Sequence, residues 1–496
     1  MQSLHSPTQA AQWLRASVQG HLHSDSRKVQ QGDGFLAWPG LAHDARHYVA
    51  QALAQGASAC LVEAQGVESF AWADSAGKIA AFNGLKQACG PIADAYFDSP
   101  SHQLQMLAVT GTNGKTTTAW WLSYALTQAG QRCKLVGTLG MGDAQYIHNT
   151  GMTTPDPVSL HAQLRQWVDE GVKACAIEAS SIGLQEHRLD GTYLRIAIFT
   201  NFTQDHLDYH ATMAAYWQAK ASLFAWTGLQ AAVINIDDPQ GHTLAKQLQS
   251  QQEQSHLDIW TVSLRQAARL QAKSLRNMVN GLQFDVVEGH DIHSVHTQGL
   301  GEFNVLNLLG VIAAMRSLGY PLAAAVKACH DLPAVPGRMQ SLGNAHTPLV
   351  VIDYAHTPDA LIQVLKALRP VAQERQGQLH CVVGCGGNRD TSKRASMASA
   401  AEAGADHLVF TSDNPRNEDP QRIIEHMLAG LQATTQAEIY IDRAQAITRT
   451  IANANTQDIV LIAGKGHETY QEIGATKLAF SDQQHALAAL KMRGLE

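Results

Sequence analysis

A glycine-rich loop between an apolar run and a helical pattern is the feature of this chain that most constrains its fold. The apolar residues 106–109 precede GTNGKTT at 111–117, and a helical pattern follows at 119–126 and stops near Gly130. A strand, a glycine loop and a helix in this order form the context that a phosphate loop requires. The sequence therefore predicts an α/β domain that holds a nucleotide phosphate.

The residue types of this loop suit the chemistry of phosphate. Glycines let backbone N–H groups close around phosphate oxygens, and the helix N-terminus adds positive potential. Lys115 would neutralise the β- and γ-phosphates, and the Thr116 hydroxyl would bind Mg²⁺. Val109 stands where the general pattern has a glycine, so the loop matches a shorter variant. The alternative is a chance glycine turn, which the GKT core disfavours, and the loop alone indicates only nucleotide binding.

The rest of the chain alternates short strand-like runs with helical patterns, which indicates an α/β fold with largely parallel sheets. A chain of 496 residues is too long for one ordinary core. Breaks containing proline interrupt the pattern at 98–101 and 332–338. We expect three domains, over residues 1–98, 99–336 and 337–496. We also expect a helix at 81–97, and peripheral strands and loops of the middle domain at 251–300.

The composition limits the partners of the chain. Its net charge of −7 argues against bulk binding of nucleic acid or of an anionic membrane. No stretch approaches the roughly 20 apolar residues of a membrane helix, and the first residues lack the basic start and apolar run of a signal peptide. The seven cysteines include no CxxC pair, which is typical of buried, reduced thiols. We therefore expect a cytoplasmic protein that is not inserted in a membrane.

Two later segments predict polar side chains at the carboxyl ends of strands. One expected strand, 173–178, ends at Glu178, and another, 195–200, is followed by His206. Ligands of parallel α/β sheets bind beyond these strand ends, so both side chains are expected near the phosphate loop. A carboxylate and an imidazole can hold a divalent cation. The alternative for His206 is a loop histidine bonded to Asp205 or Asp208, and Lys220, in a helical stretch at 213–224, is on these grounds an ordinary surface lysine.

Further motifs, in their order along the chain, resemble the Mur ligase family. Those of the middle of the chain are GTNGKTT at 111–117, EASS at 178–181, FTNFTQDHLDYH at 199–210, AAYWQAKASLF at 214–224 and GEFNVLN at 301–307. Those that follow are PGRM at 336–339, DYAHTPDAL at 353–361, GCGGNRD at 384–390, TSDNPRNEDP at 411–420, DRAQAI at 442–447 and AGKGHETYQ at 463–471. The segment 24–37 is similar to the UDP-binding domain of the family, so the resemblance covers almost the entire chain.

The resemblance implies a function. DNPR at 413–416 is typical of the members that add diaminopimelate. It therefore implies an ATP-dependent ligase that joins meso-diaminopimelate to the D-Glu γ-carboxylate of UDP-MurNAc-L-Ala-D-Glu, in peptidoglycan synthesis. It further implies ATP as a co-substrate, two Mg²⁺ ions and a monomer. The implied architecture is a UDP-binding α/β domain, a central P-loop ATPase-like parallel sheet and a C-terminal Rossmann-like domain.

The resemblance also implies roles for individual residues. The nucleotide would be bound by Gly111, Thr112, Asn113, Gly114, Lys115, Thr116, Thr117, Asn304, Arg338, Asp353 and His356. The UDP-dipeptide would be bound by Ser24, Ser26, Thr153, Thr154, Ser180, Glu186 and Arg188. Diaminopimelate would be bound by Arg389, Asp413, Asn414, Pro415, Arg416, Gly464 and Glu468. Lys220 would be a carbamate (N6-carboxylysine) that acts with Thr116, Glu178 and His206 at the metal, and the catalytic residues would be Lys115, Lys220, Glu178 and His206.

Departures from the family pattern leave alternatives open. They fall at Leu41, Ala42, Ile182, Glu186 and Gln204, on the side of the UDP-dipeptide. One alternative is a ligase that adds lysine, against which DNPR speaks. A second is a ligase like folylpolyglutamate synthase, against which the segment 24–37 speaks. A third is an inactive relative that only binds, which is disfavoured by the intact Lys115, Thr116, Glu178, His206 and Lys220.

Overall fold

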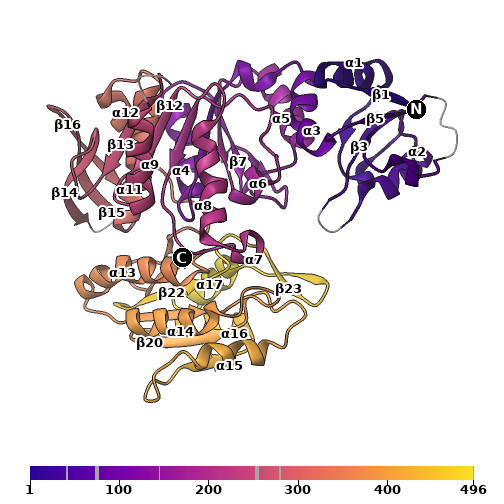
Figure 1. Cartoon of the computed structure of the whole chain (residues 1–496). Coiled ribbons are helices and arrows are strands. Elements are labelled where there is room, and N and C mark those ends of the chain that lie inside the picture. The colour runs from indigo at the N-terminus through magenta and orange to yellow at the C-terminus, as the bar shows by residue number, and fades with distance from the viewer. Residues whose placement is uncertain (41–42, 73–76, 144–145, 252–255, 279–280, 495–496) are drawn as a thin grey trace.

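The computed structural model of this chain describes residues 1–40, 43–72, 77–143, 146–251, 256–278 and 281–494. Three larger sheets follow one another along the chain, and each lies between helices (Figure 1). The predicted three-domain α/β architecture is confirmed, whereas the boundaries after residues 98 and 336 stay a prediction. Leu41 and Ala42, two of the departures from the family pattern, lie outside the described residues.

The N-terminal sheet has the order β1-β5-β4-β3-β2, and all its neighbouring strands are parallel. Its elements are β1 (Gln2–Leu4), α1 (Pro7–Ser17), β2 (Leu22–His23), β3 (Gly34–Ala37), α2 (Val49–Ala54), β4 (Ala59–Glu63), β5 (Ile79–Phe82) and α3 (Leu85–Tyr96). The helices α1 and α3 pack on one face of the sheet and α2 on the other.

The helix expected at 81–97 is wrong at its start. Ile79–Phe82 form the buried strand β5, and the helix begins only at Leu85. Gly84 between them has a φ of 72°, a left-handed conformation that favours glycine. A short apolar run fits a buried strand or a buried helix equally well, and here pairing with β1 and β4 decides for the strand.

The central sheet has the order β16-β15-β14-β13-β12-β11-β6-β10-β7-β8-β9. Its strands are β6 (Gln105–Thr110), β7 (Cys133–Gly137), β8 (Gly140–Gly142), β9 (Ile147–His148), β10 (Ala174–Glu178), β11 (Ile196–Phe199), β12 (Ala231–Asn235), β13 (Asp258–Ser263), β14 (Leu270–Met278), β15 (Gly281–Glu288) and β16 (Asp291–Thr297). The strands from β14 to β7 are parallel, and the outer ones are antiparallel. The stretch 251–300 thus supplies peripheral strands, as predicted.

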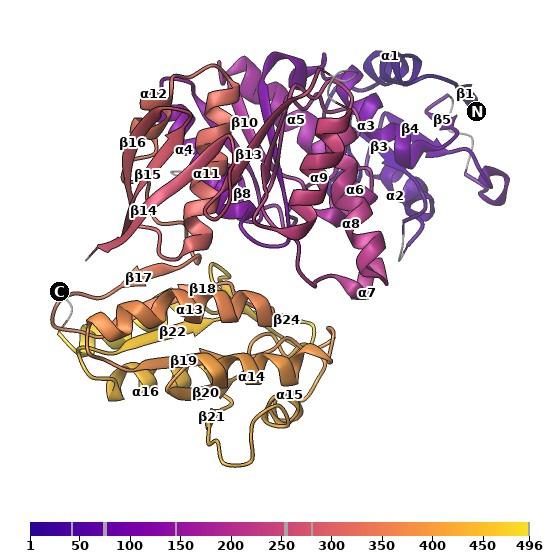
Figure 2. The same cartoon turned by 60° about the vertical axis from the view of Figure 1, so that its left-hand side comes forward.

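Helices cover both faces of this sheet. They are α4 (Lys115–Gln128), α5 (Pro157–Asp169), α6 (Ser181–Gln185), α7 (Leu207–His210), α8 (Met213–Ala221), α9 (Pro239–Ser250), α11 (Glu302–Ser317) and α12 (Leu322–Ala328). Side chains of α4 and α11 pack with Leu107 and Val109 on one face, and those of α5 and α9 pack with Met106 and Ala108 on the other. Figure 2 shows α11 and α9 on opposite sides of the sheet. The short α7 projects toward the C-terminal domain (Figure 1).

The C-terminal sheet has the order β17-β18-β22-β19-β20-β21, and only β17 runs antiparallel to its neighbour. Its strands are β17 (Gln340–Leu342), β18 (Leu349–Asp353), β19 (Leu379–Val383), β20 (His407–Thr411), β21 (Glu438–Tyr440) and β22 (Ile459–Ala463), and a hairpin pairs β23 (Tyr470–Ile473) with β24 (Thr476–Ala479). Its helices are α13 (Pro358–Glu374), α14 (Lys393–Gly404), α15 (Pro420–Leu428), α16 (Arg443–Asn453) and α17 (Asp482–Met492). The first three cover one face and the last two the other.

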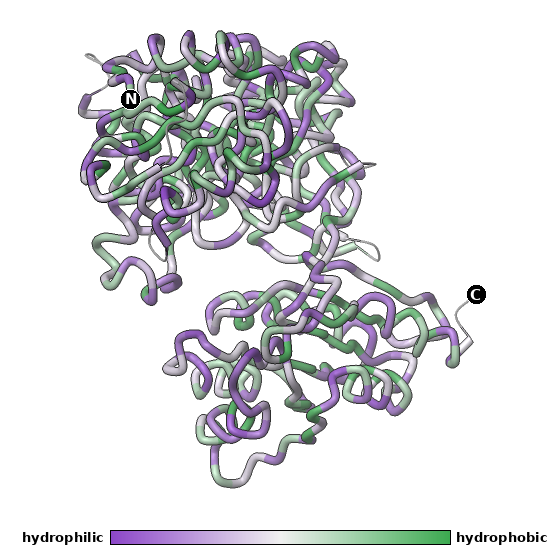
Figure 3. The backbone as a smooth tube through the Cα atoms, turned by 90° about the vertical axis from the view of Figure 1, so that its right-hand side faces the viewer, coloured by the Kyte–Doolittle hydropathy of each residue, from purple (hydrophilic) through white to green (hydrophobic). Residues whose placement is uncertain are grey.

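The apolar strands form the core of each domain. In Figure 3 the hydrophobic stretches run through the interior of the upper body, and hydrophilic ones lie mostly along its outline. All seven cysteines are buried and free, which confirms the expectation that these thiols are buried. Among the described residues, no helix is long and apolar enough to cross a membrane.

A buried ion pair holds the ends of two C-terminal strands together. Arg443 binds Asp482 through Nε–Oδ1 at 2.7 Å and Nη2–Oδ2 at 2.8 Å, and neither side chain is exposed. Arg443 also donates to the carbonyl oxygens of Ala463 at the end of β22 and of Ser412 just after β20. The pair therefore supports the loops that follow these strands.

Asp482→Ala is expected to lower the free energy of unfolding by about 3–5 kcal/mol, because Arg443 would keep a buried, uncompensated charge. Asp169→Ala is the matched control, since Asp169 is 65% exposed in its pair with Arg165 on α5. Its expected loss is about 0.5 kcal/mol or less. Thermal and denaturant unfolding of the two variants measure the difference. Equal stability of the two would contradict a stabilising role for the buried pair.

Candidate active site

The phosphate loop lies between β6 and α4, as predicted. Lys115 is the first residue of α4, and Gly114 before it has a φ of 85°. The Lys115 ammonium donates to the carbonyl oxygens of Gly111 at 2.9 Å and Thr112 at 2.8 Å, so its side chain curls over the loop. The hydroxyl of Thr200, just after β11, donates to the Asn113 carbonyl at 2.6 Å. The loop is thus fixed at the carboxyl edge of two adjacent strands, where ligands of such sheets bind.

A residue of the predicted middle-to-C-terminal joint reaches this loop. Arg338 Nη2 donates to Thr116 Oγ1 at 3.2 Å, and its guanidinium lies 4.4 Å from the centre of the Tyr354 ring. Arg338 also lines a small cleft with Thr117 and Asn304. Four residues predicted to bind the nucleotide therefore lie together, although they come from distant parts of the sequence.

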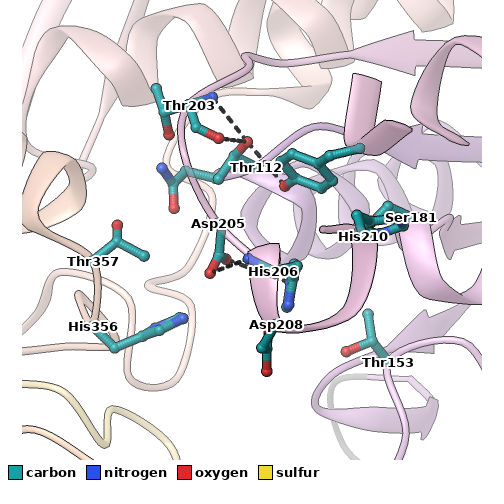
Figure 4. A network of polar contacts seen from close by, with 12 residues as sticks. Thr112, Thr153, Ser181, Thr203, Asp205, His206, Asp208, His210, His356 and Thr357 are labelled. Atoms are coloured by element: carbon teal, nitrogen blue, oxygen red, sulfur yellow. Dashed lines mark hydrogen bonds and ion pairs between the residues drawn. The ribbon is translucent and has the colours of Figure 1, made fainter. Parts of the chain in front are cut away.

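Two further residues predicted at the nucleotide come from the end of β18 and the segment that follows it. Asp353 ends β18 and accepts a hydrogen bond from Met339 N at 2.7 Å. Burial raises the pKa of Asp353 to about 6, although the nearby Arg338 charge opposes this. His356 hydrogen-bonds the Tyr354 carbonyl through Nδ1 at 2.7 Å, and burial lowers its pKa. Figure 4 shows His356 on the C-terminal side of the site, facing Asp205 of the central domain.

Lys220 is buried next to the phosphate loop, so its interpretation as a surface lysine is wrong. Only 1% of Lys220 is exposed, and its Nζ donates to the Gly111 carbonyl at 2.8 Å. The nitrogen also lies 4.4 Å from the centre of the Tyr216 ring. Burial, with the neighbouring Lys115 charge, lowers the pKa of Lys220 well below that of a free lysine. A neutral amine is therefore favoured at this position, and a neutral amine is the form that reacts with CO₂.

Glu178 is buried at the end of β10 and is held by Thr138. The Thr138 N–H donates to Glu178 Oε1 at 2.8 Å, and the Thr138 hydroxyl donates to Oε2 at 3.2 Å. These bonds fix the carboxylate at the strand end. Burial lowers the pKa of Lys115, and the negative charge of Glu178 opposes this effect.

His206 precedes α7 and lies beside Asp205, at 3.4 Å between His206 Nε2 and Asp205 Oδ2 (Figure 4). Burial lowers the pKa of His206 to about 4, and the charges of Lys115 and Lys220 act in the same direction, whereas Asp205 opposes them. The imidazole is therefore neutral near pH 7 and keeps a nitrogen lone pair for a metal or a proton. The contact with Asp205 is also the one that the alternative interpretation of His206 expects.

The residues present suit a hard cation only together with a nucleotide. Within the described ranges, no three His, Cys, Asp or Glu side chains form a group that could hold a metal ion. The available donors are the Thr116 hydroxyl, the Glu178 carboxylate and the neutral His206. Mg²⁺ commonly keeps few protein ligands and takes phosphate oxygens as well, so this sparse, oxygen-bearing set fits it.

Four of the seven residues predicted to bind the UDP-dipeptide lie around Glu178, namely Thr153, Thr154, Ser180 and Arg188. Thr154 Oγ1 donates to the Glu178 carbonyl at 2.7 Å and lies 2.9 Å from Ser180 Oγ, and Arg188 Nη1 donates to the Thr154 carbonyl at 3.0 Å. The hydroxyls of Thr153 and Thr138 lie 3.0 Å apart. From the N-terminal domain, Ser24 donates to Asp156 Oδ1 at 3.0 Å. Ser26 is buried in the turn Ser26–Lys28, and Glu186 instead contacts Lys86 and Tyr209.

A second polar cluster lies in the C-terminal domain. Asn414 follows β20 and Glu468 follows β22, and Asn414 Nδ2 donates to Glu468 Oε2 at 2.9 Å. The fully buried Lys465 donates to Asn414 Oδ1 at 2.9 Å and to Glu468 Oε2 at 2.8 Å. Lys465 therefore orients both the amide and the carboxylate.

The guanidinium of Arg416 lies beside this cluster and is joined to it through Glu472. Arg416 has a φ of 50°, and its side chain binds Glu472 Oε2 at 3.1 Å and the Gly387 carbonyl at 2.8 Å. Asp413 packs against Gly464, where a Cβ would lie 2.7 Å from Asp413 Oδ2. The Pro415 carbonyl accepts from the Glu418 N–H at 3.0 Å and shapes the turn. Arg389 lies farther out, 56% exposed and 3.7 Å from Asp208 of α7.

Sequence reasoning did not find three residues that the structure places at the site, namely Thr138, Lys465 and Lys86. Lys465 belongs to the AGKGHETYQ motif and lies between the candidate residues Gly464 and Glu468, so its position in the sequence could have indicated a role at the site. Thr138 and Lys86 lie outside every motif, and only tertiary contacts reveal them.

Comparisons with known proteins agree with this geometry. Residues 109–315 match the Mur ligase middle domain, and residues 337–466 match the Mur ligase glutamate ligase domain. The UDP-N-acetylmuramoyl-L-alanyl-D-glutamate–2,6-diaminopimelate ligase of Acidovorax sp. (strain JS42) is 56% identical over 100% of this chain and 99% of the relative. A solved structure with the same protein name is 35% identical, has a TM-score of 0.66, and covers 96% of this chain and 95% of its own. A structure of MurF ligase from Thermotoga maritima in complex with ADP has a TM-score of 0.64 at 15% identity, covers 95% and 97% of the two chains, and shows the shared fold.

A phosphate loop at the edge of a parallel sheet and a polar cluster in the next domain, together with these matches, define an ATP-dependent ligase that forms amide bonds. The chain belongs to the Mur ligase family. These matches confirm the family and the ligase class that the sequence predicts.

Proposed function

We propose that this ligase adds meso-diaminopimelate to the D-Glu γ-carboxylate of UDP-MurNAc-L-Ala-D-Glu, with ATP converted to ADP and phosphate, in peptidoglycan synthesis. The named relatives support this assignment, since 2,6-diaminopimelate is in the name of the Acidovorax protein and of the solved structure. The proposal extends to the individual residues of the three binding sites.

The arrangement of Arg416, Asn414 and Glu468 is the observation that carries the proposal. A guanidinium can bind a carboxylate with two parallel hydrogen bonds, and a carboxylate can accept from an ammonium. Arg416 and Glu468 flank Asn414, which contacts Glu468 directly, at the ends of β20 and β22. The carboxylate and the ammonium of one amino-acid end match these two groups in charge.

The chemistry requires two anions to approach each other. The γ-carboxylate of D-Glu would attack the γ-phosphate of ATP to give an acyl phosphate and ADP. The amine of diaminopimelate would then attack the acyl carbon, lose a proton and release phosphate. Lys115 would offset the charge repulsion at the γ-phosphate, and Arg338 would lie beside it from the domain joint. Thr116, Glu178, His206 and a Lys220 carbamate would hold Mg²⁺, which neutralises phosphate charge when it is bound.

Phosphate release with defined substrates tests the proposed function. We expect release that requires ATP, the UDP-dipeptide and meso-diaminopimelate together, and a product with the mass of the UDP-tripeptide. Release with L-lysine instead would favour the lysine-adding alternative, and release with a folate and glutamate would favour the folylpolyglutamate synthase alternative. Binding of the UDP-dipeptide without any turnover would indicate an inactive relative.

Lys220→Ala is expected to reduce ligation by about 10²-fold or more, because it removes an anionic carbamate from the charged site. Added formate or acetate should restore part of the activity by placing a small carboxylate in the space left. Bicarbonate should raise the activity of the unmutated enzyme after CO₂ has been removed, and it should not affect the variant. Near-normal kinetics of Lys220→Ala would show that Lys220 is only a packing residue.

A further inference from the structure

Glu186 carries a carboxylate at the junction of three elements. It caps the C-terminus of α6, and its Oε2 lies 2.8 Å from Lys86 Nζ on α3 of the N-terminal domain. Its Oε1 accepts a hydrogen bond from the Tyr209 hydroxyl on α7. The Glu186 side chain is only 16% exposed, and that of Lys86 is 32% exposed. The pair therefore links the N-terminal domain to the segment that carries His206.

The carboxylate of Glu186 lies near a cation of the proposed UDP-dipeptide site. Burial alone would raise the pKa of Glu186, but Lys86, Tyr209 and the charge of Arg188 together hold it below its usual value. Glu186 is therefore ionised at neutral pH and lies within electrostatic reach of Arg188. The Arg188 side chain is held by the Thr154 carbonyl at 3.0 Å, beside Glu178.

Two cations thus act on one carboxylate, and only Lys86 is in contact with it. With Lys86 present, both oxygens of Glu186 have partners, so Arg188 is not needed as a counter-charge and can bind an anionic group of the substrate. Without Lys86, the largely buried Glu186 carboxylate would lack its main counter-charge and would form an ion pair with Arg188 instead. Arg188 would then be neutralised by the protein itself, and Glu186 would add a negative charge at a site for an anionic substrate.

We propose that Lys86 is a positioning residue of the UDP-dipeptide site, which binds Glu186 and so leaves Arg188 free for an anionic group of that substrate. This inference rests on the proposed function. It assigns to the N-terminal domain an electrostatic role at the acceptor end of the substrate, in addition to binding the UDP group. Glu186 is also a departure from the family pattern. The role of Lys86 therefore applies to chains that carry an acidic residue at position 186.

Substrate binding by Lys86→Met tests the proposal. We expect the Kd and the KM for UDP-MurNAc-L-Ala-D-Glu to rise about tenfold, because a charge pair loses one partner. We expect the KM for ATP, and kcat at saturating substrate, to stay within about twofold, since the phosphate loop has no contact with Lys86 in the described structure. Lys86→Arg, which keeps the cation, should bind nearly as well as the unmutated enzyme, and Lys78→Met, at an exposed lysine of the same domain, is the matched control.

A double variant separates electrostatics from packing. Lys86→Met with Glu186→Gln removes both charges but keeps a side chain of the same size that can still hydrogen-bond the substrate, so its Kd should return to within about threefold of the unmutated value. A purely structural role predicts the opposite result, in which the double variant binds no better than Lys86→Met and only the unfolding temperature falls. That result, or a normal Kd in Lys86→Met, would overturn the proposal. Failure of the proposed function is distinguishable, because the unmutated enzyme would then neither bind the UDP-dipeptide nor release phosphate with it.

Discussion

Lys115→Ala is expected to reduce ligation by at least about 10³-fold while the fold stays intact. In the structure the Lys115 ammonium donates to the Gly111 and Thr112 carbonyl oxygens, which places it over the loop where the phosphates would lie. Burial lowers the pKa of Lys115, although Glu178 and Asp205 oppose this. A bound polyphosphate would favour the charged form, so Lys115 would carry its proton during phosphoryl transfer.

The loss should appear in the chemical step as well as in binding. Charge builds up between the phosphate and the attacking carboxylate only as they react, so the lysine contributes more to the transition state than to the bound ATP. Phosphate release and ADP formation measure the step, and thermal unfolding checks the fold. Lys173→Ala, at an exposed lysine of the same domain, is the control. Activity within tenfold of the unmutated enzyme would show that the phosphate loop has been misinterpreted.

Local patterns were enough to predict the parts of the site that lie within one strand, loop and helix. Glycines, an apolar run and a helical pattern define the loop at 111–117, because its backbone geometry depends on neighbours in sequence. The ends of β10 and β11 were predicted for the same reason, to within one residue. The start of α3 could not be predicted in this way, because an apolar run of four residues suits both a strand and a helix.

Contacts between distant segments could not be predicted from single patterns. Arg338 and Thr116 meet across the domain joint, and Lys86 and Glu186 come from two domains. Their distances depend on how whole sheets pack against one another, which no local motif encodes. Lys220 is an example. Apolar residues do not gather on one face of its helix, so the sequence does not predict that Lys220 is buried, but the neighbouring phosphate loop covers its side chain.

The second large expected effect is the selectivity of the enzyme for its amino-acid substrate. We expect the enzyme to prefer meso-diaminopimelate over L-lysine by roughly 10⁴-fold or more. The two molecules share one amino-acid end and differ at the other by a single carboxylate. A site built to bind that carboxylate leaves its own buried donors without an acceptor when lysine binds, and this desolvation cost is the source of the discrimination.

Arg416 is the group expected to bind the distal carboxylate, with Asn414 beside it and Arg389 farther out. Two contacts, to Glu472 and to the Gly387 carbonyl, fix the guanidinium and leave its remaining N–H groups for a ligand. Arg416→Ala should therefore lose most activity with diaminopimelate through a weaker amino-acid interaction, and ATP binding should change little. Arg416→Lys should rescue poorly, because an ammonium cannot form the two parallel bonds. Arg422→Ala, at an exposed arginine of α15, is the matched control.

Loss of Arg416 should not change the preferred substrate of the enzyme to lysine. Removing Arg416 takes away a contact to the distal carboxylate and leaves Glu468, Lys465 and Asn414 in place, so it creates no new contact for lysine. Competition between the two amino acids at equal concentration, read by product mass, measures the preference in both the unmutated enzyme and Arg416→Ala. If the unmutated enzyme used lysine as readily as diaminopimelate, the DNPR segment would not select the substrate, even though the chain is a ligase. Normal diaminopimelate kinetics in Arg416→Ala would instead place the recognition of the distal carboxylate on another residue, with Arg389 the next to test.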